Sequence, residues 1–233
     1  MRINKYLAST GLASRRNAEK FILDGRVKVN NVICTNLATD IKQNDVVKFD
    51  NKVIKPTEKF VYFMLNKPKG YVSTASDDKG RRTVLELIDT TDRIYPVGRL
   101  DYDSEGLLLL TNDGELTYKL THPKNQIPKT YYVVINSNIS QKDIDKLEKG
   151  VIIDGRKLSG AKITIISERP DKTELNVIIH EGRNREIRKM FEVIGKFVTF
   201  LKRTKIANLS LGKLQRGTYR QLSQKEVKYL KSL

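Results

Sequence analysis

The sequence predicts an α+β protein with a small N-terminal domain and a larger domain built on a mostly antiparallel mixed sheet flanked by helices. Apolar stretches typical of strands alternate with helical stretches, but without the strict strand–helix–strand order of a parallel fold. The 233 residues are enough for two cores, and a proline-containing segment without an apolar pattern divides them. We therefore expect domains at 1–50 and 60–233, joined by a linker at 51–59.

The first 50 residues predict two helices followed by short strands. Ile3 and Leu7 lie four residues apart, on one face of the first helix. Ser14 has the chemistry of an N-cap and opens the second helix. The apolar face of that second helix consists of Ala18, Phe21 and Ile22. Alternating valines then predict a hairpin over 27–33 and a further strand over 46–49.

The larger domain mixes strands and helices along its whole length. The run from Gly106 to Thr111 is continuously apolar, which is typical of a strand buried on both faces. Ser223 and Glu226 form a capping box that opens the last helix. The other expected strands are 61–65, 131–135 and 175–179, and the other expected helices are 115–120, the stretch between Ser140 and Gly150, and 184–194.

The positive charge of the chain is concentrated at its two ends. Lys and Arg number 44 against 27 Asp and Glu, so the formal net charge is +17. Residues 1–60 contain 12 basic and 6 acidic side chains, residues 61–182 contain 18 of each, and residues 183–233 contain 14 and 3. A neutral middle between basic ends favours a surface that binds phosphate, most simply that of a nucleic acid, over charge used only for solubility.

Several classes of protein are excluded by composition. No window approaches the roughly 18 apolar residues that span a bilayer, and the N-terminus lacks an apolar signal core. The single cysteine, Cys34, excludes internal disulfides and a Cys-rich zinc site. Two histidines, His122 and His180, cannot form a His-rich metal centre by themselves. We therefore expect a cytoplasmic protein that uses no metal.

Basic side chains gather on the second helix of the small domain and just after it. A row of charges is usually only a solvated face. Here two adjacent arginines open a helix, where positive charge opposes the helix dipole, so phosphate binding is favoured. The side chains expected to bind phosphate are Arg15, Arg16, Lys20, Arg26 and Lys28, and the family resemblance described below implies that this phosphate is that of RNA.

The densest group of reactive side chains lies between Gly98 and Gly106, just before the buried strand. Asp101, Asp103 and Glu105 place three carboxylates within five residues. A solvated acidic loop is the simplest interpretation, but loops before buried strands often carry catalytic groups. Apolar Leu100 and cationic Arg99 beside these acids favour the catalytic interpretation.

Two stretches of the chain resemble known families. Arg2–Leu7, Ser14–Glu19 and Gly25–Asn30 resemble the S4 (αL) RNA-binding domain. The rest resembles the ribosomal RNA pseudouridine synthases of the RsuA/RluB type, through five motifs in the family's order. These motifs are Asn66–Gly70, Gly98–Asp101, Ser104–Gly114, Lys129–Tyr131 and Gly182–Phe191. The resemblance implies isomerisation of uridine to pseudouridine without metal or cofactor.

The resemblance assigns roles to four residues. Asp101 matches the catalytic aspartate, acting either as a nucleophile on the sugar or as a base, and Arg188 matches the cation expected beside it. Tyr131 matches the tyrosine that stacks on the target uracil, and Arg99 matches a position that touches RNA near the flipped nucleotide. Asp103 and Glu105 are then solvated or structural acids.

The resemblance is closest to the B-type enzymes, which modify 23S ribosomal RNA, because the chain has Asn184, Arg185 and Glu186 where the small-subunit type tends to have His-Gln at the last two positions. The expected partner is therefore ribosomal RNA, bound by a monomer in precursor or assembly particles. A 16S-specific enzyme and a non-catalytic rRNA-binding assembly protein are the alternatives. A glycosidase that pairs Asp101 with Asp103 on one face of a strand is a third. Ala207 stands where many relatives have glycine.

Overall fold

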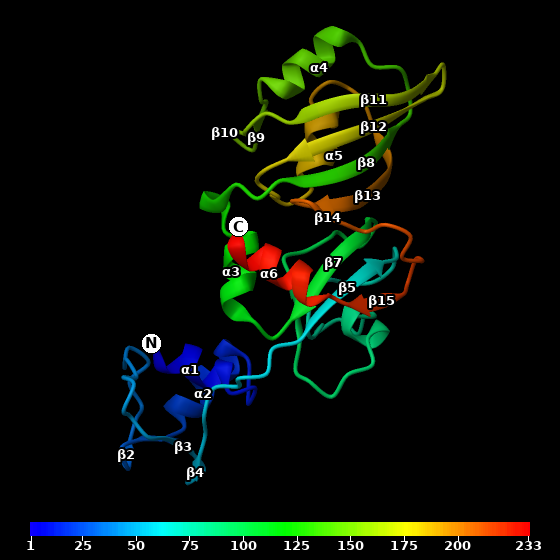
Figure 1. The fold of residues 1–233 in the computed structure, drawn as a ribbon. Coiled ribbons are helices and arrows are strands. Elements are labelled where there is room, and N and C mark those ends of the chain that lie inside the picture. Colours follow the sequence, from blue (N-terminus) through cyan, green and yellow to red (C-terminus); the bar gives the residue numbers. More distant parts are fainter. The chain divides into compact units, whose positions relative to one another are not determined.

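The structure is a computed structural model that describes residues 1–233, and the chain divides into two compact units. The first comprises Met1–Val61 with the short segments Thr90–Arg93 and Asn112–Gly114, and the second comprises the remainder. Each unit is described by itself below (Figure 1). The domain boundaries expected from the sequence remain predictions.

The first unit packs two helices against a small antiparallel sheet of order β2-β1-β3-β4. Its core contains Ile3 and Leu7 from the first helix and Ala18 and Ile22 from the second, all completely buried. Ser14 caps the second helix by accepting a hydrogen bond from the backbone N–H of Asn17 at 3.1 Å, as predicted. The elements are α1 (Ile3–Ser9), α2 (Arg15–Leu23), β1 (Val27–Val29), β2 (Val32–Ile33), β3 (Val47–Phe49) and β4 (Lys52–Val53).

The second unit has a nine-stranded sheet and a separate two-stranded hairpin, β9 with β10. Its strands are β5 (Tyr62–Lys67), β6 (Tyr95–Val97), β7 (Glu105–Thr111), β8 (Lys129–Ile135), β9 (Ile152–Ile153), β10 (Arg156–Lys157), β11 (Lys162–Arg169), β12 (Lys172–Ile179), β13 (Val198–Ile206), β14 (Leu209–Ser210) and β15 (Tyr219–Gln221). Its helices are α3 (Gly114–Thr121), α4 (Gln141–Glu148), α5 (Glu186–Glu192) and α6 (Gln224–Ser232), with 3-10 turns η1 (Val84–Leu87) and η2 (Pro123–Asn125).

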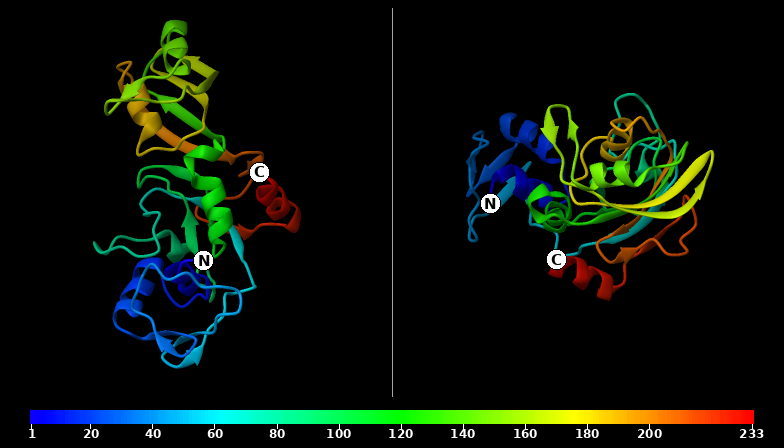
Figure 2. Two further views of the ribbon diagram at one scale, coloured as in Figure 1. Left: turned by 90° about the vertical axis from the view of Figure 1, so that its left-hand side faces the viewer. Right: turned by 90° about the horizontal axis from the view of Figure 1, so that it is seen from above.

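The large sheet has the order β11-β12-β8-β13-β7-β5-β15, with β14 paired to β13 and β6 paired to β7. All of these pairs are antiparallel except β13 with β7, which confirms the mostly antiparallel mixed sheet. The parallel pair joins only Lys202 to Glu105 and Arg203 to Gly106. Figure 2 shows the same ribbon from two further directions.

The core beside β7 explains how the chain holds this sheet. All seven residues of β7 are buried, as its continuous apolar run predicts. Leu107 and Leu109 lie on one face with residues of α3 and α6, including Leu116, Leu120 and Leu230. These helices therefore cover β5 and β7 on that side (Figure 1). The longest helices of the chain have nine residues, and none is long and apolar enough to cross a membrane.

Two sequence predictions differ from the structure in detail. The helix expected from residue 184 begins at Glu186, because Arg185 has φ of +52° and cannot continue a right-handed helix. Residues 101–103 lie in a turn and not on a strand, so Asp101 and Asp103 do not share a strand face. The geometric basis for a glycosidase pair is therefore wrong.

Candidate active site

A cavity of about 350 Å³, here called the main cavity, lies in the second unit. Its walls include residues of the loop Gly98–Ser104, called the Asp101 loop, and of the segment His180–Arg185, called the arginine loop. Strands β8 and β13 contribute further polar side chains, notably Tyr131 and Arg203. The sequence-predicted residues Arg99, Asp101 and Tyr131 are therefore brought to one cavity, although 30 positions separate Asp101 from Tyr131.

The Asp101 loop is held from behind by the turn that follows β5. The Lys67 ammonium donates hydrogen bonds to the carbonyls of Pro68, Asp101 and Ser104 at 2.9–3.0 Å. Ser73 Oγ donates to the Leu100 carbonyl at 2.9 Å and accepts from its N–H at 3.1 Å. These contacts fix the backbone on both sides of the Asp101 carboxylate, which is half-buried.

Lys67 itself is completely buried, which is rare for lysine. Burial lowers its pKa to about 8, and the nearby carboxylates of Asp101, Asp103 and Glu105 partly oppose that shift. Sequence reasoning assigned Lys67 only to a family motif and a turn. The available signal was a lysine at the end of an apolar strand, immediately before proline, where no solvated face was expected.

Tyr131 lies on β8 directly opposite Arg203 of β13. Both side chains are buried, and Arg203 Nη1 donates to the Tyr131 hydroxyl at 3.5 Å. Arg203 Nε also donates to the Leu107 carbonyl at 2.8 Å, while its Nη2 is buried without a hydrogen-bond partner. Arg203 therefore offers a free donor among the groups that line the cavity. It was missed because β13 was not predicted.

The close pairing of β13 with β7 requires glycine at position 106. A Cβ there would lie 2.2 Å from the Arg203 carbonyl oxygen, and φ at this glycine is +107°. No side chain fits so close to backbone. The pairing fixes Arg203 beside the start of β7, immediately after the Asp101 loop.

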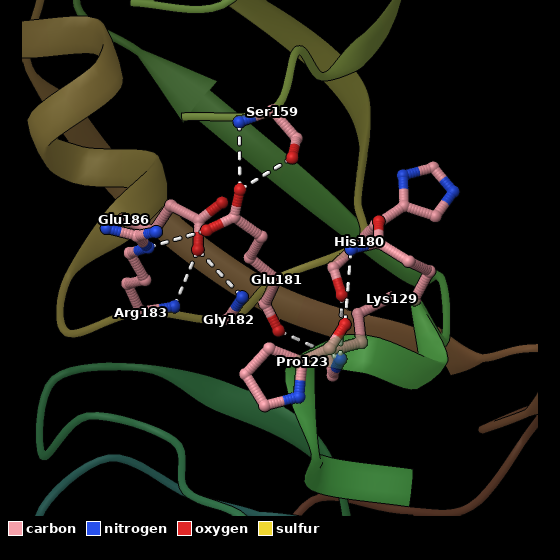
Figure 3. A network of polar contacts seen from close by, with 9 residues as sticks. Pro123, Lys129, Ser159, His180, Glu181, Gly182, Arg183 and Glu186 are labelled. Atoms are coloured by element: carbon pink, nitrogen blue, oxygen red, sulfur yellow. Dashed lines mark hydrogen bonds and ion pairs between the residues drawn. The ribbon is translucent and has the colours of Figure 1, made fainter. Parts of the chain in front are cut away.

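The arginine loop is held by a network of charged side chains (Figure 3). Glu186 accepts hydrogen bonds from the N–H groups of Gly182 and Arg183 at 2.7 and 2.6 Å. Lys129 donates to the carbonyls of Ile127, His180 and Glu181 at 3.0–3.4 Å. The loop thus has both amides and carbonyls bound by side chains that lie close to the cavity (Figure 3).

Burial shifts the titration of both groups in this network. It lowers the pKa of Lys129 to about 8, and the positive charge of Arg203 adds to that effect. It raises the pKa of Glu186, although the two backbone N–H donors oppose the rise. The Glu181 carboxylate, which accepts from Ser159 N and Oγ at 2.8 and 2.6 Å, has a lowered pKa because of these bonds.

The guanidinium of Arg188 is bound to Asp103, and not to Asp101 as expected. Its Nη2 lies 3.0 Å from Asp103 Oδ2, and its Nη1 donates to the Val198 carbonyl at 2.7 Å. Arg185 approaches the same carboxylate at 3.4 Å. The difference arises because Asp103, two residues further along the turn, presents its carboxylate to α5. Asp103 is thus a structural acid, and so is buried Glu105, which lies 3.4 Å from Arg216.

In the first unit the predicted RNA-binding side chains form two groups. Arg15, Arg16 and Lys20 of α2 are exposed and carry no ion pair. Arg26 pairs with Asp50 at 2.5 Å and lies over the rings of Phe21 and Phe49. Lys28 donates to Asn51 Oδ1 at 2.9 Å. Of the two groups, only the side chains of α2 therefore have charges that are not bound to another side chain of the protein.

The fold and the cavity define a class of protein before any particular family. Residues 1–47 match the S4 domain, an RNA-binding module, and the second unit supplies a cavity lined by Asp101, by two further carboxylates and by several buried donors. Such a protein is an enzyme that acts on RNA.

Residues 61–193 match the family described as RNA pseudouridylate synthase, and the chain belongs to this family. It is 43 % identical to ribosomal large subunit pseudouridine synthase B of Bacillus subtilis, over 100 % of this chain and 96 % of that protein. It is 40 % identical to an uncharacterized RNA pseudouridine synthase of Aquifex aeolicus, over 99 % and 93 %. A crystal structure of a pseudouridylate synthase superposes with a TM-score of 0.73 at 32 % identity, covering 99 % of both chains.

Proposed function

We propose that this pseudouridine synthase acts on one uridine of the large-subunit ribosomal RNA and uses Asp101 as its catalytic aspartate. The observation that carries the proposal is the Asp101 carboxylate, which lines the same cavity as Tyr131 and Arg203 on a loop bound by Lys67. The likeness to the B. subtilis large-subunit enzyme supports the choice of subunit. We also propose that the enzyme is a cytoplasmic monomer and that its substrate is ribosomal RNA in precursor or assembly particles.

The reaction is an isomerisation, so every atom of the uridine is retained. The bond from N1 of uracil to C1′ breaks, the base turns in the cavity, and a bond from C5 to C1′ forms. A proton leaves C5 and N1 gains one, which balances the change. Asp101 acts on the sugar, as a nucleophile at C1′ or as a base, and in both roles its carboxylate is ionised.

The cavity contains groups suited to hold the base while it turns. Tyr131 presents a buried ring for stacking, and its hydroxyl is oriented by Arg203. The unpartnered Nη2 of Arg203 provides a donor for a uracil carbonyl. Arg188 acts through Asp103 and is a positioning residue for the Asp101 loop.

Replacement of the aspartate tests the catalytic assignment. Asp101→Asn keeps the shape of the side chain but removes its charge, so pseudouridine formation should fall by at least about 100-fold. Affinity for RNA should change little. The matched control is Asp171→Asn, which alters an exposed aspartate in the β11–β12 turn. Mapping of pseudouridines in ribosomal RNA with and without the protein gives activity, subunit and site together, and wild-type activity in Asp101→Asn would remove this residue from its role.

The exposed arginines of α2 are proposed to bind RNA phosphates. Arg15→Glu combined with Arg16→Glu should weaken RNA binding and reduce the salt dependence of log Kd by roughly 1–2 units of slope, because fewer counterions are released. Arg156→Glu with Lys157→Glu makes the same charge change on the exposed β9–β10 hairpin and serves as control. An unchanged slope in the α2 variant would mean that these arginines do not hold phosphate.

A further inference from the structure

A second hollow, of about 640 Å³, adjoins the main cavity along the Asp101 loop, and we call it the side hollow. Its other wall is the loop from Val72 to Arg81. Four residues line both spaces, namely Arg99, Leu100, Asp101 and Arg185. The Asp101 loop is therefore a thin partition, with the proposed reaction on one side and an unassigned space on the other.

A polynucleotide bound at the main cavity must continue past this partition. A uridine that is flipped into the main cavity stays covalently linked to the nucleotides on either side of it. Enzymes that flip a base commonly read the adjoining nucleotides as well. Since the partition is formed by the short stretch Arg99–Asp101, a neighbouring nucleotide can reach the side hollow without a long excursion of the RNA backbone.

The side hollow contains an aromatic ring, that of Tyr102, which makes no ring contact and no side-chain hydrogen bond within the chain. Tyr102 follows Asp101 directly, lines the side hollow, and is 53 % exposed. Its backbone carbonyl accepts a hydrogen bond from Gly70 N at 2.9 Å, and the loop on both sides of it is bound by Lys67. A large ring on a fixed backbone is a platform on which a base can stack with little loss of entropy.

The charges of the side hollow suit a base better than a phosphate. Asp77 is bound to Arg81 at 2.6 Å, and Asp103 is bound to Arg188 and Arg185, so these charges are largely matched. Asp78 is exposed and carries no ion pair. A carboxylate accepts hydrogen bonds from the amino groups of bases and repels phosphate. Phosphate groups would instead meet Arg99, which is exposed at the partition.

We propose that the side hollow binds the base of a nucleotide next to the target uridine, stacked on Tyr102 and recognised through its amino group by Asp78. The inference rests on the proposed function, because it takes the uridine to occupy the main cavity. The preferred neighbour is accordingly adenine, guanine or cytosine, all of which carry an amino group, and not uracil.

The test measures binding to a ribosomal RNA fragment that contains the mapped uridine, using the full chain in the Asp101→Asn background. Tyr102→Ala should raise Kd by roughly 5- to 150-fold, the range for loss of one base–aromatic stack. Tyr102→Phe is the matched control and should bind within about 2-fold, since it keeps the ring. Removing the contacted neighbouring base from the RNA should raise the Kd of the parent protein by the same factor. The Kd of Tyr102→Ala should not rise further with this abasic RNA.

A base substitution tests the role of Asp78. Replacing the contacted base by uracil should weaken binding to the parent protein, and Asp78→Asn should remove much of that preference. The proposal is overturned if Tyr102→Ala binds like Tyr102→Phe. It is equally overturned if abasic sites on either side of the uridine leave the effect of Tyr102→Ala unchanged.

Failure of this inference can be told from failure of the proposed function. The binding measurements require no turnover, so they report on the side hollow alone. Pseudouridine formation by the wild type and its loss in Asp101→Asn report on the main cavity. If the wild type is active and Tyr102→Ala binds RNA with unchanged affinity, only the proposal for the side hollow is wrong. If Asp101→Asn is active, the catalytic assignment is wrong.

Discussion

The Asp101 loop and the arginine loop both line the main cavity and are held in the same way. Behind each lies a lysine whose ammonium donates three hydrogen bonds to backbone carbonyls, Lys67 in the first case and Lys129 in the second. Burial lowers the pKa of both to about 8. The hydrogen-bond pattern alone would therefore suggest that the two are equivalent.

Their electrostatic surroundings differ in balance. Lys67 lies among the carboxylates of Asp101, Asp103 and Glu105, which favour its charge and outweigh the opposing effect of Arg203. For Lys129 the order is reversed, because Arg203 disfavours its charge more than Glu186 favours it. The first lysine thus compensates the negative loop that carries the proposed catalytic group. The second adds positive charge to a wall that already carries Arg183 and Arg185. The same three-carbonyl contact thus supports the loop of the proposed catalytic aspartate in one place and an arginine-rich loop in the other.

Of the two lysines, Lys67 should cause the larger loss of stability and activity when it is replaced. Lys67→Met leaves buried carbonyls without donors, each costing about 1–3 kcal/mol, and removes a buried cation that lies near three carboxylates. We expect a loss of about 3–5 kcal/mol in the free energy of unfolding and loss of pseudouridine formation. Urea unfolding and an rRNA modification assay measure both.

Lys69→Met is the control for that variant, since Lys69 is exposed on the same turn. It should unfold within about 0.5 kcal/mol of the wild type. A Lys67→Met protein as stable as Lys69→Met would show that the three hydrogen bonds do not hold the Asp101 loop.

Lys129→Met should have a smaller effect, because removal of this cation also relieves its repulsion with Arg203. We expect a loss of about 1–2 kcal/mol at neutral pH, from the unpaired carbonyls of the arginine loop. The sign of its pH dependence follows from the lowered pKa. Between about pH 8 and the ordinary lysine value of 10.5, the unfolded chain binds the proton and the folded chain does not. The stability of the wild type relative to Lys129→Met should therefore rise with pH over that interval.

Urea unfolding of both proteins from pH 7 to 10.5 measures this difference. Lys129→Arg is a useful companion, since its guanidinium remains charged throughout and should abolish the rise. A wild-type advantage that stays flat with pH would mean that Lys129 is protonated equally in the folded and unfolded chain, and one that falls with pH would mean that folding raises its pKa.

The sequence was sufficient for features that depend on local pattern. The buried strand β7 follows from its leucine run, and the caps at Ser14 and Ser223 follow from side chains that bind the first turn of a helix. Asp101 and Tyr131 were identified as site candidates from family motifs, and both line the main cavity. Their catalytic roles remain proposals.

Contacts between distant segments could not be predicted in this way. The preference of Arg188 for Asp103 depends on where the turn after Asp101 presents each carboxylate to α5. Arg203 becomes a cavity residue through its register with Tyr131, which no local pattern reveals. The left-handed Ala207, with φ of +47°, is consistent with a position where relatives were expected to have glycine.

The parallel contact between β7 and β13 gives the sheet a seam. Two residue pairs join one half, which carries the Asp101 loop, to the other half, which carries Tyr131 and the arginine loop. Gly106 lets the two backbones meet, and Arg203 crosses the junction by donating from β13 to the Leu107 carbonyl. The distance between the Asp101 carboxylate and the Tyr131 ring thus depends on a junction only two residues long. Any shear between the two halves would therefore first change the width of the main cavity.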